Sequence, residues 1–199
     1  MDKNSDEKHL KILKKFKNLK TGVFIDEANI FYIEKEIGWK LDWLKIKNLL
    51  EKYLRTKNLN YYLGMPKDGR ARIKNEKVKL NLETLGFNVI TKPLKKIYVD
   101  QRGGKFKYKC NFDVEIAFDI ARLIEKLDLV VVVSGDSDYL EAKKFSLERG
   151  KKFMFLCFEK RVAWEIRKVY HLFFEDIKEL VQKQTPRQAR GGITAKFIA

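Results

Sequence analysis

The sequence predicts an α/β protein, a three-layer sandwich in which helices cover both faces of a mostly parallel sheet. Short β-branched and apolar segments alternate with longer segments of helical periodicity, which is the pattern of repeated strand–helix–strand units. Val130 to Val133 is a run of four valines without polar alternation, as in a central strand that is buried on both faces. With 199 residues, 45% of them hydrophobic, the chain is long enough to form one domain with a real core.

The first part of the chain is predicted to hold a helix, a strand and a second helix. The N-terminal segment (1–20) has the pattern of a basic amphipathic helix, with lysines between apolar residues that recur every three positions, at Leu10, Leu13, Phe16 and Leu19. Docking on the domain is its simplest role, and contact with a membrane or with nucleic acid is the alternative. A short buried strand is expected at 22–25, and apolar residues at helical spacing predict a helix at 41–54.

The middle of the chain continues the alternation and then becomes basic. Strands are predicted at 58–65 and 87–93, with a helix at 70–85 that ends at a capping glycine. The segment 92–109 mixes lysines and aromatic residues around a central Gly-Gly pair. This composition favours a β-hairpin or a mobile loop.

The second half of the chain completes the predicted sandwich. Its expected elements are, in order, a helix at 112–127, the valine strand, a helix at 139–149, a strand at 152–158, a helix at 163–169 and a short strand at 171–177. The domain is therefore expected to span 21–182. The segment 183–199 contains no acidic residue and is expected to be an unstructured tail or an expression remnant, so it is excluded from the fold.

The charge of the chain indicates a polyanionic partner. Lysine and arginine number 43 against 27 acidic residues, a formal net charge of +16. Nucleic acid is the first candidate and an acidic membrane surface the second. Cys110 and Cys157 form no C-x-x-C pair, which favours a reduced, cytoplasmic setting. The sequence has neither the apolar core of a signal peptide nor a run of about 18–20 apolar residues, so no membrane span is expected.

Acidic residues follow two predicted strands and begin one predicted helix. Asp26 ends the first strand, Asp113 begins the helix at 112–127, and Asp136 and Asp138 follow the valine strand. Ligands bind at the carboxyl ends of the strands in open α/β sheets, so these carboxylates are expected to converge there. Carboxylate oxygens suit Mg²⁺ or Mn²⁺, and such ions promote phosphodiester hydrolysis. Asn29 could orient a carboxylate, a water or the phosphate.

Each of these acids has a simpler structural interpretation. An aspartate before a helix is commonly an N-cap, and we expect capping to be at least as plausible as catalysis for Asp113 and Asp138 taken singly. Asp26 and Asp136 end apolar strands, where a carboxylate needs a partner to offset its desolvation. Asp119 lies six residues after Asp113, about 240° around a helix, so a supporting role beside a basic residue is expected.

Four segments together resemble a known family. IDEAN, KCNFDVEIAFD, VVSGDSDYLEAKKFSLERGKKFMFL and AWEIRKVYHLFFEDI look like the motifs of the NYN domain, the LabA-like branch of the PIN-like nuclease superfamily, over about residues 22–181. The resemblance implies a PIN-like α/β/α sandwich and the activity of a divalent-metal-dependent endoribonuclease, and it is the only reason to prefer RNA over DNA. It assigns metal binding and catalysis to Asp26, Asp113, Asp136 and Asp138, with Asn29, Asp119, Ser134 and Ser137 as auxiliary positions. Cys110 departs from the family pattern, in which glycine is common.

Substrate contact is predicted for the basic and aromatic segment 92–109. Lysine and arginine contact phosphates without regard to sequence, and aromatic rings stack on unpaired bases. The candidate residues are Lys92, Lys95, Lys96, Arg102, Lys105, Lys107 and Lys109, with Tyr98, Phe106 and Tyr108. A second basic stripe at 67–79 is interrupted by acidic residues and ranks lower.

Other functions are weaker matches to the sequence. In GDSD, Ser137 resembles a serine-esterase nucleophile, but the only histidines, His9 and His171, lack the context of a catalytic base. A phosphatase of the haloacid-dehalogenase type needs a second aspartate where Ala28 stands, and no P-loop motif occurs. The serious alternative is a non-catalytic nucleic-acid-binding or protein-interaction module on the same fold.

Overall fold

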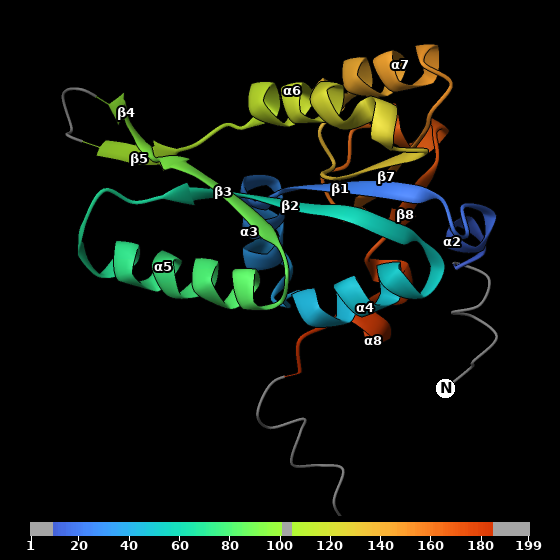
Figure 1. Ribbon diagram of the computed structural model, residues 1–199. Helices are drawn as coiled ribbons and strands as arrows, with labels where there is room; N and C mark the ends of the chain where they lie inside the picture. The colour runs from blue at the N-terminus through green and yellow to red at the C-terminus, as the bar shows by residue number, and fades with distance from the viewer. Residues whose placement is uncertain (1–9, 101–104, 185–199) are drawn as a thin grey trace, which may run out of the picture.

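A computed structural model describes residues 10–100 and 105–184, and its centre is a six-stranded parallel sheet (Figure 1). All five strand pairings are parallel. The strands lie in the order β3 (Asn88–Pro93), β2 (Arg55–Met65), β1 (Lys20–Asp26), β6 (Leu129–Val133), β7 (Lys152–Cys157) and β8 (His171–Phe173). The predicted α/β architecture around a parallel sheet is confirmed.

Helices cover both faces of the sheet, as Figure 1 shows. One face carries α6 (Asp113–Leu123) and α7 (Leu140–Glu148), and the other carries α3 (Glu27–Ile37), α4 (Trp43–Tyr53), α5 (Gly69–Thr84) and α8 (Lys178–Val181). The valine strand contributes alternate residues to the two cores, so that Val131 packs with one layer and Val132 with the other. Burial on both faces is the reason why this strand has no polar alternation.

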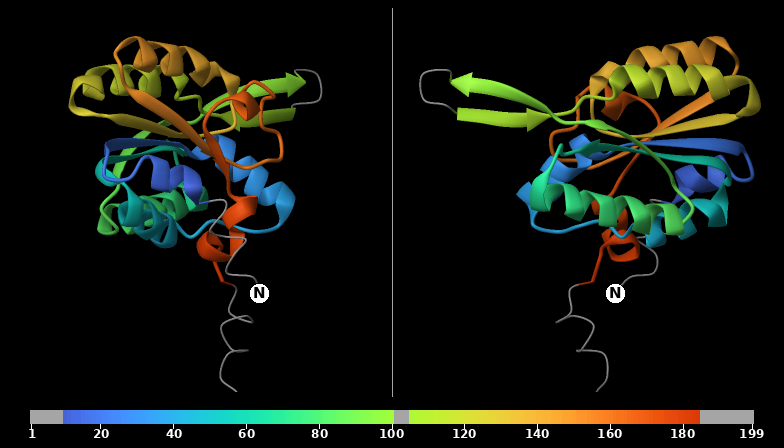
Figure 2. Two further views of the ribbon diagram at one scale, coloured as in Figure 1. Left: turned by 90° about the vertical axis from the view of Figure 1, so that its right-hand side faces the viewer. Right: turned by 60° about the vertical axis from the view of Figure 1, so that its left-hand side comes forward.

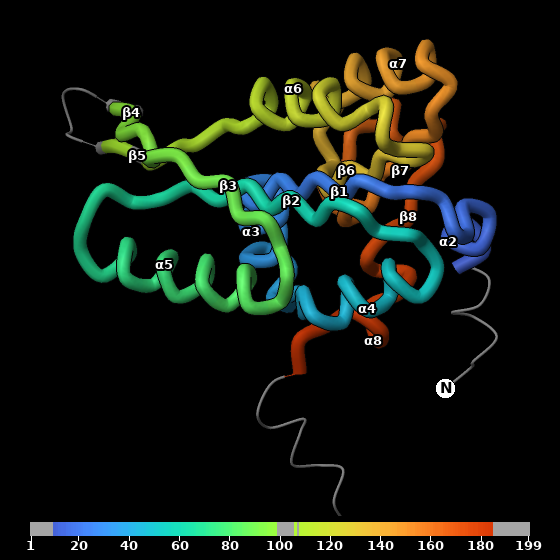
Figure 3. The backbone as a smooth tube through the Cα atoms, viewed as in Figure 1, coloured from blue at the N-terminus to red at the C-terminus, as the bar shows by residue number. Residues whose placement is uncertain are grey.

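The two central strands, β1 and β6, mark the point where the strand order reverses. The chain moves outward from β1 through β2 to β3, and it later returns to the centre at β6 and moves outward the other way (Figure 3). The connections after β1 and after β6 therefore diverge. Such a topological switch leaves an opening at the carboxyl edge of the sheet, where open α/β proteins bind ligands.

The described part of the basic N-terminal segment contains a short helix, α2 (Lys11–Lys15). Leu10, Leu13 and Phe16 are buried in the domain core, and the intervening lysines 11, 14 and 15 point to the outside of this single turn. The packing agrees with the docked interpretation of this segment. Within residues 10–20 the helix ends at Lys15, earlier than expected, and residues 1–9 lie outside the described part of the chain.

The segment between β3 and α6 forms a separate β-hairpin. Strands β4 (Lys95–Asp100) and β5 (Lys105–Lys109) pair antiparallel and form a two-stranded sheet of their own. Figure 2 shows this hairpin extending away from the body of the domain. The predicted hairpin is confirmed, although Arg102 and the Gly-Gly pair lie outside the described residues.

Three local predictions need correction. Helix α3 was not expected, although Asp26 caps its beginning and Gly38 ends it with a left-handed φ of 76°. The segment 163–169 is not an α-helix: it has turns and one 3₁₀ turn (Ile166–Lys168). Its backbone is instead fixed to the loop after β6, because the Ala163 N–H donates to the Gly135 carbonyl at 3.0 Å. The last strand ends at Phe173 and a 3₁₀ turn follows at Glu175–Ile177.

Candidate active site

A cavity of about 490 Å³ lies at the carboxyl edge of the sheet, beside the ends of β1 and β6. Residues from α3, β2, α5, β5, α6 and the loop after β6 line it. Its carboxylate residues are Asp26, Glu27, Asp113 and Asp136. Three of the four predicted catalytic acids therefore face one cavity, at the switch point that the strand order creates.

Asp26 is the most deeply buried of these acids, with 7% of its surface exposed. Its carboxylate accepts from the backbone N–H of Asn29 at 3.4 Å, which makes it the N-cap of α3. The other carboxylate oxygen lies 3.2 Å from the Tyr139 hydroxyl and 3.5 Å from the Ser134 hydroxyl. Burial raises the pKa of Asp26 to about 6, and the negative charges of Asp113 and Asp136 contribute to the rise.

Asp113 and Asp136 approach Asp26 from the two neighbouring elements. Asp113 is the first residue of α6, and its carboxylate accepts from the Tyr139 hydroxyl at 3.0 Å. Asp136 follows β6, and its carboxylate accepts from the Asp138 N–H at 3.1 Å. Tyr139 thus lies between Asp26 and Asp113, and its single hydroxyl proton serves one of them at a time.

The capping prediction was assigned to the wrong aspartates. The carboxylates that cap are those of Asp26 and Asp136, at the start of α3 and of the 3₁₀ turn Ser137–Tyr139. Asp113 makes no such contact, and the Asn111 side chain accepts its N–H at 2.8 Å instead. Asp26 is the last residue of β1 and α3 begins at the next residue, whereas Asp136 lies three residues after the end of β6 and directly precedes the 3₁₀ turn.

The remaining predicted residues differ in how close they lie to the cavity. The Asn29 side-chain oxygen accepts from the Gly135 N–H at 3.1 Å, and the Ser134 hydroxyl donates to the Asp26 carboxylate at 3.5 Å, so both connect the end of β1 to the loop after β6. The Ser134 hydroxyl also accepts from the Asp136 N–H at 3.3 Å. Asp138 is exposed and is not part of the cavity wall, and Ser137 also lies outside it. Asp119 is paired elsewhere, with Arg122 at 2.8 Å and the Tyr62 hydroxyl at 2.9 Å.

Tyr139 and Glu27 are among the residues of the site that the sequence reasoning missed. Tyr139 directly follows Asp138, and a buried tyrosine hydroxyl needs a polar partner, which was the available signal. Glu27 follows Asp26 and also lines the cavity. Burial raises the pKa of Glu27 to about 7, with further contributions from the charges of Asp26 and Glu34. Its role in lining the cavity depends on α3, which the sequence reasoning did not predict.

The donor chemistry of the cavity suits a hard divalent cation. Asp26, Asp113 and Asp136 offer only oxygen ligands. Burial, with a smaller contribution from the charges of Asp113 and Asp136, raises the pKa of Asp26, and a cation would relieve the cost of ionising it. Their side chains do not form a ready coordination set, because no group of three or more His, Cys, Asp or Glu residues in the described ranges is arranged to hold a metal ion. The ligand types therefore fit Mg²⁺ or Mn²⁺, while the observed side-chain positions would have to adjust.

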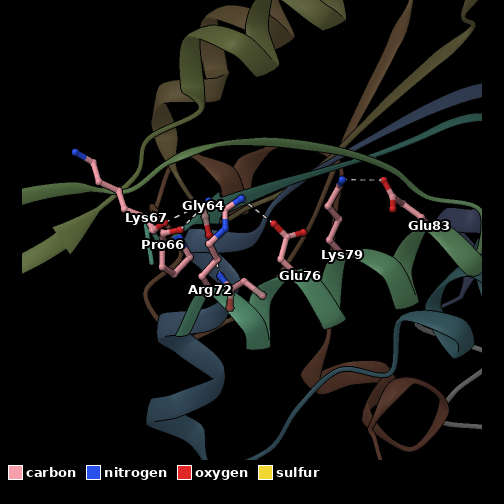
Figure 4. Close-up of polar contacts among 8 residues, drawn as sticks. Gly64, Pro66, Lys67, Arg72, Glu76, Lys79 and Glu83 are labelled. Atoms are coloured by element: carbon pink, nitrogen blue, oxygen red, sulfur yellow. Dashed lines mark hydrogen bonds and ion pairs between the residues drawn. The ribbon is translucent and has the colours of Figure 1, made fainter. Parts of the chain in front are cut away.

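The two basic segments beside the cavity differ in what their side chains contact. On α5, Arg72 pairs with Glu76 at 3.0 Å and lies near the carbonyls of Pro66 and Lys67, and Lys79 lies 3.6 Å from Glu83 (Figure 4). On the hairpin, Lys96 lies instead above aromatic rings, 3.9 Å from the centre of Phe106 and 5.0 Å from that of Tyr98.

Hairpin aromatics form an exposed row. The ring centres of Tyr98 and Phe106 are 6.4 Å apart, and those of Phe106 and Tyr108 are 5.6 Å apart. Tyr98, Phe106 and Tyr108 are all exposed, and Tyr108 also lines the acid cavity. The row therefore leads from the hairpin to the carboxylates. Among the predicted basic contacts, Lys92 is paired with Glu115 and Lys109 lines the cavity.

The fold and the acid-lined switch point define a PIN-like α/β sandwich. The chain belongs to the NYN domain family, which matches residues 20–177. It is 26% identical over 174 residues to the low amplitude and bright protein LabA of Synechococcus elongatus, covering 84% of this chain and 90% of that protein. It also resembles the crystal structure of a protein of unknown function from Vibrio parahaemolyticus, with a TM-score of 0.63, 21% identity, and coverage of 79% and 93% of the two chains.

The helices of the described residues were compared with the requirements for a membrane span. Within residues 10–100 and 105–184, none combines the length and the apolar character that crossing a bilayer requires. Cys110 and Cys157 are both free thiols.

Proposed function

We propose that this protein is a divalent-metal-dependent ribonuclease that hydrolyses phosphodiester bonds in the cytoplasm. The observation that carries the proposal is the convergence of Asp26, Asp113 and Asp136 on one cavity at the topological switch point, with Tyr139 between the first two. Membership of the NYN family supports the reaction class and the choice of RNA. Asp138, which is exposed next to the cavity, is proposed as a fourth acid at its rim.

Mg²⁺ or Mn²⁺ would be held by the carboxylates of Asp26, Asp113 and Asp136. Such a cation, when bound, supplies acidification of a water molecule and neutralisation of phosphate charge. The chain's own residues prepare the site. Tyr139 and Ser134 hold the Asp26 carboxylate by hydrogen bonds, and Asn29 fixes the end of β1 to the loop after β6.

The hairpin and the cavity rim would hold the RNA. Lysines supply contacts to phosphates, and exposed aromatic rings supply stacking on unpaired bases. The hairpin is favoured over α5 for this role, because Arg72 and Lys79 of α5 are already paired with acidic neighbours. The residues proposed to contact RNA are those predicted for the segment 92–109, from Lys92 to Lys109.

A non-catalytic RNA-binding module is the second candidate. Two observations favour it: Asp26 and Asp136 already have structural roles as caps, and the acids in the described ranges do not form a ready metal site. A binding module would keep the basic hairpin and need no cation.

The substitution Asp136→Asn separates the two candidates. It keeps the cap, because asparagine caps about as well as aspartate, while it removes one negative charge from the cavity. For a nuclease, the wild type should cut single-stranded or structured RNA with Mn²⁺ and stop with EDTA. The variant should lose most of the activity, at least about 100-fold, and still bind RNA in EDTA.

Two results would reject the nuclease proposal. Cleavage that persists equally in the purified variant would indicate a contaminant or another site. Tight RNA binding without cleavage by the wild type, across RNA and DNA substrates, would establish the binding module. Melting temperatures measured on both proteins verify that the variant is folded.

A further inference from the structure

Two aromatic side chains on α3 are exposed although their helix lies against the core. Phe31 is 45% exposed and Tyr32 is 55% exposed, and their ring centres lie 5.7 Å apart in an edge-to-face arrangement. The neighbours Ile30 and Ile33 supply the buried face of the helix, so packing does not need these two rings. Exposed aromatic residues that cluster indicate a binding surface.

Both rings line the acid cavity. Helix α3 begins directly after Asp26, so its second turn places Phe31 and Tyr32 at the cavity wall. On the other side the wall includes Tyr108 of the hairpin, which is 52% exposed. The cavity thus combines three exposed rings from two separate elements with a group of carboxylates.

The charges around these rings favour nucleic acid as the occupant. Lys74 of α5 and Lys109 of β5 line the same cavity, and the chain as a whole carries a net charge of +16. Ammonium groups contact phosphates, and rings stack on the faces of bases. A nucleotide offers a phosphate for the ammonium groups and a base for the rings, and its sugar separates the two.

We propose that Phe31 and Tyr32, with Tyr108, form a base-stacking subsite that positions one unpaired nucleotide beside Asp26, Asp113 and Asp136. This inference rests on the proposed function, and it adds the residues that place the strand. A volume of about 490 Å³ is in the range of pockets that hold one small ligand. Bases inside a duplex are stacked on their neighbours and do not offer a free face, so the subsite selects unpaired nucleotides.

The subsite also extends the aromatic row of the hairpin. Tyr108 belongs to both, since it lies next to Phe106 on β5 and lines the cavity. A single strand bound along Tyr98, Phe106 and Tyr108 would therefore reach the carboxylates at Phe31 and Tyr32. These two residues act on the reaction through the position of the strand, so they are positioning residues.

Binding measurements in EDTA test the subsite without any cleavage. The first probe is a fluorescent single-stranded RNA octanucleotide. The second is a series of the same octanucleotide in which two adjacent nucleotides lack their bases, at a different position in each member. The third is the octanucleotide annealed to its complement. The test protein is the double variant Phe31→Leu/Tyr32→Leu, which keeps apolar bulk at two exposed positions. Phe31→Tyr/Tyr32→Phe keeps both rings. Tyr170→Leu removes a ring that is as exposed as Phe31, contacts Lys15 of α2 and does not line the cavity.

The affinity of the wild type for the intact single strand should be at least about tenfold higher than for the strand whose abasic nucleotides fall at the position that the subsite contacts. The leucine variant should lose about tenfold on the intact strand and should no longer respond to the abasic nucleotides, because both changes remove the same contact. The ring-preserving variant and Tyr170→Leu should behave like the wild type. The duplex should bind more weakly and should be little affected by the leucine changes.

Independent, additive losses from the leucine and abasic changes would overturn the subsite, as would unchanged affinity of the leucine variant or the absence of binding by the wild type. The outcome is separable from that of the nuclease proposal. A shared loss without Mn²⁺-dependent cleavage would keep the subsite and reject the nuclease. Cleavage lost in Asp136→Asn together with additive binding losses would keep the nuclease and reject the subsite.

Discussion

The two edges of the central sheet carry aspartates in opposite circumstances. At the amino edge, Asp128 accepts the Lys20 N–H at 3.0 Å at the start of β1, and the α2 segment covers this end with buried apolar side chains. At the carboxyl edge, Asp26 lies among other acids, and its pKa is raised to about 6 by burial and like charge. The difference indicates that one edge is organised for stability, while the other retains electrostatic repulsion that a bound cation would relieve.

Loss of packing at the amino edge should give the largest effect on stability. Phe16 is fully buried, and its ring lies 5.2 Å from that of Tyr170. Phe16→Ala should lower the free energy of unfolding by about 3–5 kcal/mol, because it leaves a cavity in the core. Chemical denaturation measures this loss, and Leu44→Ala, at an exposed position on α4, is the matched control, expected within about 0.5 kcal/mol of the wild type. A loss below about 1 kcal/mol would contradict the structural role of this edge.

Removing a negative charge at the carboxyl edge should stabilise the protein, in contrast to the loss expected for Phe16→Ala. The folded pKa of Asp26, about 6, lies above its ordinary value of 3.8, so the folded state holds the proton more tightly than the unfolded state does. In EDTA the stabilisation that the protonated Asp26 gives the folded state is therefore fully present below about pH 4, and it is lost as the pH rises to 6 and above. Asp26→Asn should be more stable than the wild type at pH 8, by about 3 kcal/mol, and should lose most of this advantage at pH 4. A variant less stable than the wild type at pH 8 would refute this account of the edge.

The two basic segments beside the carboxyl edge should differ in RNA binding. Changing Lys95, Lys96, Lys105 and Lys107 to Ala should weaken binding of single-stranded RNA and make the slope of log affinity against log salt shallower by up to about 3, since each phosphate contact contributes roughly 0.7. The matched control is Arg72→Ala with Lys79→Ala on α5, whose charges are already paired. Affinity measured over a salt series distinguishes them. If the α5 changes cause the larger loss, α5 carries the RNA.

Removal of the Tyr139 hydroxyl should have the smallest of the predicted effects, a modest loss of cleavage activity. Tyr139→Phe deletes the hydrogen bonds at 3.2 Å to Asp26 and 3.0 Å to Asp113 and keeps the buried ring. The loss should reduce Mn²⁺-dependent cleavage by about tenfold or less, in keeping with about 1 kcal/mol for a hydrogen bond. The same change should move the acidic limb of the pH–rate profile upward, because Asp26 loses a donor to its charged form. A uniform loss without that movement would limit Tyr139 to a packing role.

The sequence was sufficient to predict the architecture, because its strongest patterns are physical requirements of a parallel sheet. The four valines need burial on both faces, and the alternation of strands and helices sets their order. Helix α3 was missed because IDEAN was interpreted as the end of a strand, although the strand's last residue also caps a helix. The segment 163–169 was misassigned because its local spacing resembles a helix, while tertiary contact with Gly135 determines its backbone.

The positions of site residues could be predicted from the sequence where the order of the strands determines them. They could not be predicted where the packing of a helix determines them. Asp26 and Asp136 had to meet, since their strands are neighbours at the switch point. The place of Asp113 depends on how α6 packs, and only the structure shows it next to Tyr139. Phe31 and Tyr32 gave no signal, because the helix that carries them was not expected. The assignment of capping to Asp113 and Asp138 failed for a local reason: Asp113 is already the first residue of α6, and Asp138 lies inside the 3₁₀ turn that Asp136 caps.

Thermal unfolding with and without Mn²⁺ tests most directly whether the carboxyl edge is a cation site. Wild-type protein stripped with EDTA should melt several degrees higher in millimolar Mn²⁺, because the cation binds the folded state and relieves the repulsion between Asp26, Asp113 and Asp136. Asp113→Asn, which removes one donor from the cavity, should lose most of this shift. An unchanged melting temperature of the wild type, or an equal shift in the variant, would contradict the account.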